Sequence, residues 1–372
     1  EDACDVLERI YESGSYPRLT VDRHWSRHNP RISGQIARPA AVRWYLRREL
    51  KKLLERGAVI TIEPAAERLE LSSPVLLERV DEAKQDPRKK KLFLFPPERV
   101  ELSLERLEHY TGTRAEDFQR HILLTNYRMH MDVFERIFPS CTKPSPPHVQ
   151  MPAYHHAIGD HLGVSLVNIG IGPSNAKNFT DHVAVLRPDA LIMVGHCGGI
   201  RNHQKIGDFV LASGYLRADL VLDAVLPLSV PVIPNLHLNL FLAQALDEAE
   251  LTYRIGTVYT TADRNWELGL ERTMTDLRAS RSLAIDMESA TVAANGFRYR
   301  IPSATLLCVS DKPLHGAPKL PEAALRFYRE TQHRHLEVAL RALDLVREQW
   351  PGGLPNAGLR SFDEPLMGGP PD

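Results

Sequence analysis

Four glycine-rich or acidic segments follow short apolar runs and hold the residues best suited to chemistry. In chain order they are VNIGIGPSN, MVGHCGGIR, AIDMESA and LLCVSDKP. Apolar runs that end in Gly, Asp or Glu are typical of buried strands that lead into a loop. Because ligands of α/β sheets bind beyond the carboxyl ends of the strands, we expect these segments to meet at one site.

Carboxylates in two of these segments predict a sugar-binding group and an acid. Asp286 and Glu288 stand two residues apart, on one face if the chain is extended, and could accept hydrogen bonds from sugar hydroxyls. The alternative is that one of them caps the following helix. Asp311 is a candidate general acid if burial favours its protonated form, and a surface turn with Lys312 is the alternative.

The glycines of the other two segments allow a ligand to approach the backbone. Gly170, Gly172 and Pro173 form a turn before an expected helix, where backbone amides would bind an anion, and a purely structural turn is the equal alternative. This segment is neither a Walker P-loop nor a GxGxxG motif. In the second segment the glycines would expose His196, whereas a catalytic pair with Cys197 is disfavoured because adjacent residues of a strand point apart.

Seven apolar runs after residue 100 predict the strands of an α/β domain. They cover residues 121–127, 165–172, 189–199, 208–216, 254–261, 282–288 and 303–311. The runs are continuously apolar, which indicates a largely parallel or mixed sheet with both faces buried by helices. A final amphipathic helix is expected over residues 321–348.

The first ninety residues predict a smaller α+β unit. Its main helix follows Pro39 and ends at Gly57, where a half-buried strand begins. The helix carries the basic residues Arg43, Arg47, Arg48, Lys51 and Lys52. They could hold a phosphate, but we favour a solvated surface with acid pairing from Glu49 and Glu55.

A polar, basic stretch followed by two prolines marks a domain boundary near residue 95. We therefore expect an N-terminal α+β domain at 1–95 and a catalytic α/β domain at 96–350. Residues 351–372 are rich in Gly and Pro, which predicts a loose tail.

Composition excludes several classes of function. Lys and Arg number 46 against 47 Asp and Glu, so no general attraction to nucleic acid or to an anionic membrane is expected. The four cysteines lie far apart, without the spacing of a metal site or of a secreted disulfide scaffold, which predicts free thiols and no metal. The sequence shows neither a membrane-spanning run nor a signal peptide, and we expect a cytoplasmic protein.

The order GIGPSNA, GHCGG with a following IGD, DMESA and CVSDKP resembles the purine nucleoside phosphorylase and nucleosidase superfamily. Within it, VNIGIGPSNAK, GHCGGIRNHQKIGD, TTADRNWE, AIDMESAT and LLCVSDKPLHG are similar to the AMP nucleosidase family, as are GQIARPAAVRWYL, HYTGT and LLTNY near the N-terminal side. The similarity covers nearly the whole chain, although the stretch between Phe138 and Gln150 is shorter than in that family. It implies hydrolysis of AMP to adenine and ribose 5-phosphate.

The resemblance also implies roles for individual residues. Cleavage of an N-ribosidic bond builds positive charge on the ribose and negative charge on the departing base, so the base needs an acid. Asp311 matches the acid that protonates the purine at N7, Glu288 matches the carboxylate that binds the ribose hydroxyls, and Met287 packs under the sugar. Trp266 would stack on adenine or merely pack beneath a loop.

Further contacts follow from the same resemblance. Residues expected to bind substrate or its phosphate are Asn126, Tyr127, Gly172, Pro173, His196, Gly198, Arg264, Asn265 and Lys312, with the basic N-terminal helix as another candidate for the phosphate. His196 stands where phosphorylases tend to carry a small hydroxyl residue, which favours water over phosphate as nucleophile. The chemistry needs no cofactor or metal.

The family further implies activation by Mg-ATP, inhibition by phosphate, a regulatory N-terminal domain, a role in purine salvage, and a homohexamer whose subunits complete one another's sites. Two alternatives remain. One is a purine nucleoside phosphorylase or another adenine nucleosidase on the same fold, and the other is a nucleotide-sensing protein without turnover.

Overall fold

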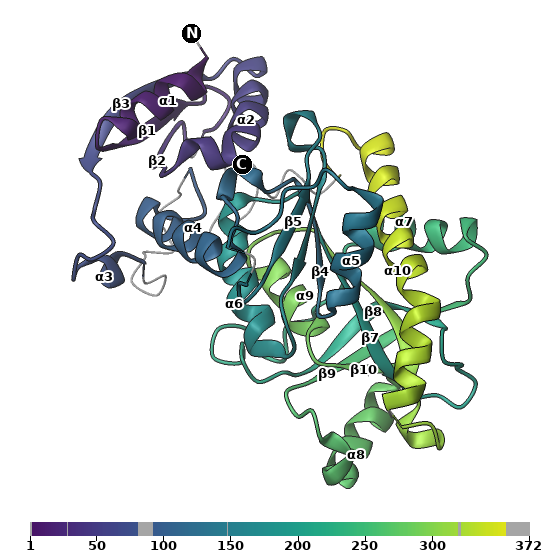
Figure 1. The fold of residues 1–372 in the computed structure, drawn as a ribbon. Helices are drawn as coiled ribbons and strands as arrows, with labels where there is room; N and C mark the ends of the chain where they lie inside the picture. Colours follow the sequence, from purple (N-terminus) through teal and green to yellow (C-terminus); the bar gives the residue numbers. More distant parts are fainter. Residues whose placement is uncertain (1, 28, 81–91, 147, 319–320, 355–372) are drawn as a thin grey trace.

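A computed structural model describes residues 2–27, 29–80, 92–146, 148–318 and 321–354 (Figure 1). The predicted tail therefore lies mostly outside the described residues. Two sheets organise the chain, one of three strands in the order β2-β1-β3 and one of eight strands in the order β10-β9-β8-β11-β7-β4-β6-β5. The fold is thus α/β with a mixed sheet, as predicted from the continuous apolar runs.

The N-terminal unit is the antiparallel three-stranded sheet covered by short helices. Its elements are α1 (Ala3–Glu12), β1 (Ser15–Asp22), β2 (Arg31–Gln35), η1 (Pro39–Val42), α2 (Arg43–Glu55), β3 (Val59–Glu67) and α3 (Leu76–Val80). The expected helix divides at Val42, because Pro39 opens a 3-10 turn before the α-helix begins. Gly57 follows the helix with a φ of +82°, the left-handed conformation that glycine adopts without strain.

The larger sheet contains all seven predicted strands and one more. They are β4 (His121–Thr125), β6 (Val164–Asn168), β7 (Ala190–Gly199), β8 (Phe209–Ala218), β9 (Tyr253–Thr261), β10 (Ala284–Asp286) and β11 (Ser303–Asp311). The unpredicted strand is β5 (Ala153–His156), an edge strand that runs antiparallel to β6. The sequence did not reveal it because four residues of mixed polarity show no clear period.

Helices cover both faces of this sheet (Figure 1). They are α4 (Pro97–Thr111), α5 (Arg128–Ile137), α6 (Pro173–Val183), α7 (Leu236–Glu248), α8 (Leu270–Ser280), α9 (Ser289–Arg298) and α10 (Pro321–Gln349). Short 3-10 turns lie at η3 (Ala115–Asp117), η4 (Gly159–His161), η5 (Ala184–Leu186), η6 (Trp266–Gly269) and η7 (Pro313–His315).

Part of the larger sheet closes on itself. Strand β10 pairs in parallel with β9 and antiparallel with β7, so β7, β11, β8, β9 and β10 form a ring. Gly198 and Gly199 of β7 face Ile285 and Ala284 at the closing pair. A Cβ at Gly199 would lie 2.8 Å from a methyl of Val309, so the glycines permit this closure.

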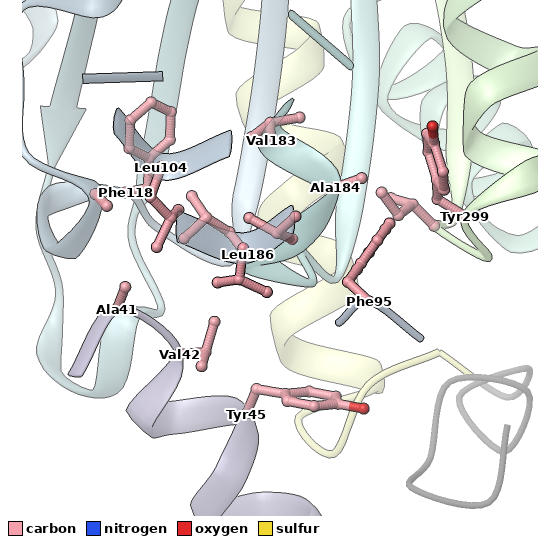
Figure 2. Close-up of a cluster of buried hydrophobic side chains, with 14 of the residues drawn as sticks. Ala41, Val42, Tyr45, Phe95, Leu104, Phe118, Val183, Ala184, Leu186 and Tyr299 are labelled. Carbon is pink, nitrogen blue, oxygen red and sulfur yellow. The ribbon is translucent and has the colours of Figure 1, made fainter. Parts of the chain in front are cut away.

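One hydrophobic cluster joins the N-terminal unit to the larger domain. Val42 and Tyr45 belong to the same buried cluster as Val183, Ala184 and Leu186 at the end of α6 (Figure 2). Burial of aliphatic and aromatic side chains of this size stabilises a contact by about 1.5 to 3 kcal/mol each. The two parts of the chain therefore share a core rather than hang from a linker.

Candidate active site

The loops that follow five strand ends surround one cavity of about 490 Å³, a volume suited to a small ligand. The predicted residues that line it are Asn126, Tyr127, His196, Gly198, Arg264, Asn265, Trp266, Met287, Glu288 and Asp311. The structure thus brings together residues that are up to 185 positions apart in the chain (126 to 311). The expectation that the four segments meet rests on the parallel strands, and the geometry agrees with it.

Three predicted residues do not line the cavity. Gly172 and Pro173 lie just behind it, and the Gly172 amide donates a hydrogen bond of 2.7 Å to Oε1 of Glu288. The Gly172 amide is therefore engaged by a protein carboxyl rather than open to an anion. The ammonium of Lys312 points elsewhere, since it donates to the carbonyl of Asn202 at 2.8 Å.

Glu288 is held at the cavity by two donors from other segments. Its Oε2 accepts a hydrogen bond of 3.1 Å from Nδ2 of Asn126, in addition to the Gly172 amide. The side chain is only 2% exposed, and burial first, then the Asp286 carboxylate, raises the pKa of Glu288 to about 8. A carboxyl that gains or loses its proton near neutral pH thus faces the ligand space.

Asp286 stabilises the start of helix α9 rather than pointing all its hydrogen-bonding capacity at the cavity. Its carboxylate accepts hydrogen bonds from the hydroxyl of Thr260 and from the amides of Glu288 and Ser289, at the start of α9. The hydroxyl of Ser289 donates to it as well. Burial raises the pKa of Asp286, although these donors oppose the shift. The chain is not extended through Glu288, because β10 ends at Asp286, and the structure agrees with the alternative that a carboxylate of this segment caps the following helix. Both residues nevertheless line the cavity.

Asp311 reaches the cavity through a β-bulge. The pairing of β11 with β7 shifts between Val309 and Asp311, which leaves Ser310 as the extra residue. The Ser310 hydroxyl is 2.5 Å from Oδ1 of Asp311, and Oδ2 lies 3.6 Å from the position that a Cβ at Gly198 would take. A bulge of this kind redirects a side chain at a strand end, and here it directs the predicted acid.

Trp266 combines the two interpretations that the sequence left open. It is 6% exposed and packs in a small hydrophobic cluster with Tyr259 and Ile285, and it also lines the cavity. Met287 lines the same cavity between two buried carboxyls. Together they supply an apolar wall beside the polar groups, the usual composition of a ligand site.

Most ionisable groups that line the cavity are carboxyl groups. Five carboxyl-bearing residues line it, namely Asp263, Glu267, Asp286, Glu288 and Asp311. Of the described residues that line it, Arg264 alone carries a guanidinium or ammonium group, and it is exposed at the rim. Within the described chain Arg264 has no carboxylate in salt-bridge range, so it is available to an anionic ligand.

The basic residues of helix α2, by contrast, form ion pairs with acidic residues of the same chain. Arg43 pairs with Asp2, Asp5 and Glu8, and Arg47 also pairs with Asp2. The remaining pairs are Arg48 with Glu49 and Asp189, Lys51 with Glu55, and Lys52 with Glu49. The predicted acid pairing from Glu49 and Glu55 is confirmed, but the predicted solvated surface is wrong for Arg48, whose side chain is 11% exposed because it pairs with the buried Glu49 and Asp189.

His196 faces away from its neighbour Cys197. The thiol packs in a hydrophobic cluster on the opposite side of β7, while the imidazole contacts Tyr127, with ring centroids 4.3 Å apart. The two side chains thus leave opposite faces of the strand, as expected for adjacent residues. The imidazole instead lies near His130 and His335, and this cluster was not predictable from the sequence because the three histidines are far apart in the chain.

The three histidines of this cluster are buried. Burial lowers the pKa of His335 to about 4 and holds that of His130 well below its ordinary value. Both rings are therefore neutral at pH 7.

Comparison with known proteins identifies the family to which this ring of strands and its cavity belong. The family model described as "Phosphorylase superfamily" matches residues 136–344. The chain belongs to the phosphorylase superfamily.

Within the superfamily the chain is similar to AMP nucleosidases. It is 46% identical to AMP nucleosidase of Escherichia coli (strain K12) over 311 residues, 73% of this chain and 64% of that protein, so it spans less than two thirds of that relative. The solved AMP nucleosidase from Bacteroides thetaiotaomicron VPI-5482 matches with a TM-score of 0.58 and 31% identity, over 67% of this chain and 98% of the other. The resemblance inferred from the motifs is confirmed.

More distant relatives share the fold alone. A purine nucleoside phosphorylase from Toxoplasma gondii superposes with a TM-score of 0.55 at 17% identity, over 65% of this chain and 98% of the other. No described helix is both long and apolar enough to cross a membrane.

Proposed function

We propose that this protein hydrolyses the N-ribosidic bond of AMP and releases adenine and ribose 5-phosphate. The observation that carries the proposal is the meeting of Glu288, Met287 and Asp311 at one cavity that also holds a tryptophan. Similarity to two AMP nucleosidases supports the choice of AMP over other purine compounds.

Asp311 would act as the general acid. The bulge aims its carboxyl into the cavity, and protonation of the purine at N7 would remove the negative charge that develops on the leaving base. Trp266 would contact the purine face, since it lines the same cavity. No metal or cofactor takes part in this step.

Glu288 would hold the ribose. Its carboxyl faces the cavity, and Oδ1 of Asn126 beside it is buried without a hydrogen-bond partner in the described chain. Both oxygens can accept hydrogen bonds from sugar hydroxyls, which would orient the ring over Met287. Water would then attack the anomeric carbon.

Hydrolysis is favoured over phosphorolysis by the charge of the cavity. Inorganic phosphate as nucleophile would need several cationic or amide donors, whereas the described residues of the cavity offer one guanidinium, that of Arg264, and a bulky His196. Arg264 and Asn265 at the rim would instead contact the 5′-phosphate of AMP.

Among the described residues of the cavity, a single guanidinium would have to bind the 5′-phosphate of AMP beside five carboxyl groups. This imbalance fits a site to which a neighbouring subunit adds a cationic group, and the resemblance to AMP nucleosidases makes a homohexamer the assembly that we propose. Light scattering would show the hexamer, and a monomer with full activity would contradict shared sites. Activation by Mg-ATP, inhibition by phosphate and a cytoplasmic role in purine salvage belong to the same proposal.

The deciding experiment incubates the purified protein with AMP, with and without Mg-ATP, in phosphate-free buffer. Adenine and ribose 5-phosphate are then separated by chromatography. Their joint appearance without added phosphate supports hydrolysis. Phosphate-dependent formation of ribose 1-phosphate from nucleosides would point to a phosphorylase instead. Tight AMP binding without adenine release under any condition would indicate a nucleotide sensor.

A further inference from the structure

Three histidines from separate elements converge behind the wall of the cavity. His130 lies in α5, His196 in β7 and His335 in α10. Each offers a ring nitrogen, and these nitrogens all lie within 4.8 Å of one another. His130 and His335 are fully buried, and His196 is 6% exposed where it lines the cavity.

Hydrogen bonds orient the rings of His130 and His335 so that one nitrogen of each points inward, and for His335 they also fix the lone pair on that nitrogen. Nε2 of His335 lies 3.0 Å from the carbonyl oxygen of Leu306, and because a carbonyl only accepts, Nε2 carries the proton and Nδ1 the lone pair. Nδ1 of His130 is 2.7 Å from the hydroxyl of Thr125, which can accept the Nδ1 proton, and in that tautomer Nε2 presents its lone pair to the interior. In the described chain neither inward nitrogen has a hydrogen-bond partner.

Buried acceptors without partners are costly. Each unmet buried acceptor costs about 1 to 3 kcal/mol. The described surroundings offer mainly ring carbon, since Phe209 packs 5.4 Å from His335 and Phe327 packs 5.3 Å from His196, between centroids. A ligand that accepts lone pairs from several imidazoles at once would remove the cost.

We propose that His130, His196 and His335 bind a divalent metal ion of the zinc class, with its fourth coordination position toward the cavity. Three histidines with one open position are a known zinc ligand set. Imidazole donors suit zinc and its first-row neighbours, whereas calcium and magnesium prefer oxygen. Histidine ligands also typically donate their other nitrogen to a carbonyl or hydroxyl, as His335 does to Leu306.

Metal binding requires the three histidine side chains to move slightly closer together. Nitrogens bound to one tetrahedral zinc lie about 3.4 Å apart, so side-chain shifts of about 1.4 Å or less would complete the set. The cluster contains no carboxylate or thiolate, and a bound ion would keep its positive charge beside an acidic cavity. It would also fix the His196 ring in the cavity wall. The inference does not depend on which substrate the cavity binds.

The test measures metal binding by the full-length protein. Protein treated with a chelator and then dialysed is titrated with Co²⁺ and, separately, with Zn²⁺, and bound metal is counted by mass spectrometry. We expect one equivalent per chain and the intense visible bands of tetrahedral cobalt. No uptake, or only the weak bands of octahedral cobalt, would overturn the proposal.

Variants locate the ion. His335→Gln and His130→Gln should bind metal at least about tenfold more weakly, since even loss of a residue that only orients a ligand weakens binding by about 10- to 100-fold. His155→Gln is the matched control, because His155 is equally buried but has hydrogen bonds to Ser165 and Thr113 at both ring nitrogens. Unchanged binding in both cluster variants would place the metal elsewhere and overturn the assignment. If these variants fail to fold, the cobalt spectrum of the wild-type protein decides alone.

Discussion

Ionisable side chains gather both on helix α2 and in the cavity, but the two regions differ in whether these side chains have partners of opposite charge. On α2 every arginine has a carboxylate partner, as in the pairing of Arg48 with Glu49 and Asp189. In the cavity, Glu288 is held by an amide and a carboxamide, and Arg264 has no acidic partner in the described chain. Charge that is paired within the protein supports the fold, whereas a carboxyl or guanidinium group without an ionic partner remains available to a ligand.

The largest expected effect is on the cavity side of this comparison. Asp311→Asn keeps the shape but removes the proton donor, so turnover of AMP should fall by about 10²- to 10⁴-fold while AMP binding is mostly kept. Rapid-quench kinetics and equilibrium binding measure the two quantities. Asp263→Asn, at an exposed position on the same cavity, is the control. Equal turnover in the Asp311 variant would remove it from the acid role.

The reverse outcome is expected on helix α2. Arg48→Met leaves the buried Asp189 and Glu49 without their guanidinium, and breaking a buried pair destabilises by about 3 to 5 kcal/mol. Arg47→Met breaks a pair whose arginine is 52% exposed and should lower stability by less than about 1 kcal/mol. Urea unfolding measures both. Similar losses in the two variants would contradict the distinction between buried and exposed pairs.

A smaller effect tests the guanidinium that lacks an acidic partner. Arg264→Met should weaken AMP binding by about 10- to 100-fold, because a hydrogen bond to a charged group contributes about 1.5 to 3 kcal/mol. Binding of adenosine, which lacks the phosphate, should hardly change, and the stability of the fold should be kept. Calorimetric titration with both ligands gives the comparison. Equal losses for AMP and adenosine would show that Arg264 does not contact the phosphate.

The last prediction concerns the pH dependence of stability, an effect that is small over any single pH unit. The folded protein keeps a proton on Glu288 up to a pKa of about 8, whereas the unfolded chain releases it near the ordinary value of 4.5. The folded state binds more protons between these values, so the free energy of unfolding falls as pH rises, by at most about 1.4 kcal/mol per pH unit. Glu288→Gln should flatten this decline, and Glu267→Gln, on the exposed rim, should leave it unchanged.

Sequence reasoning succeeded where the pattern was local and failed where it was not. The strand ends that carry Asp286, Glu288 and Asp311 were predictable, because apolar runs and the residues that follow them are contiguous. The division of labour between Asp286 and Glu288 was not, because it depends on a bend after β10 and on donors from distant segments. The bulge at Ser310 was equally hidden, since it exists only in the pairing with β7.

The edge strand and the histidine cluster show the same limit. β5 is four residues long and is defined by its partner β6. The three histidines lie on two helices and one strand, and only the packing of α5 and α10 beside β7 brings them together. The closure of the ring between β10 and β7 was also unforeseen, although the glycines that allow it were noted.

Helices α6 and α9 both begin at the cavity and end at the N-terminal unit. Gly172 and Glu288 are their N-caps, and Val183 and Tyr299, at their far ends, belong to the cluster that holds Val42 (Figure 2). Each helix spans about 15 Å, and Asn295 of α9 donates to Thr180 of α6 between the ends. Because a hydrogen bond joins the two helices, a displacement of the N-terminal unit would move both helices together. It would then reach Gly172 and Glu288, which are hydrogen-bonded to each other, at the same time.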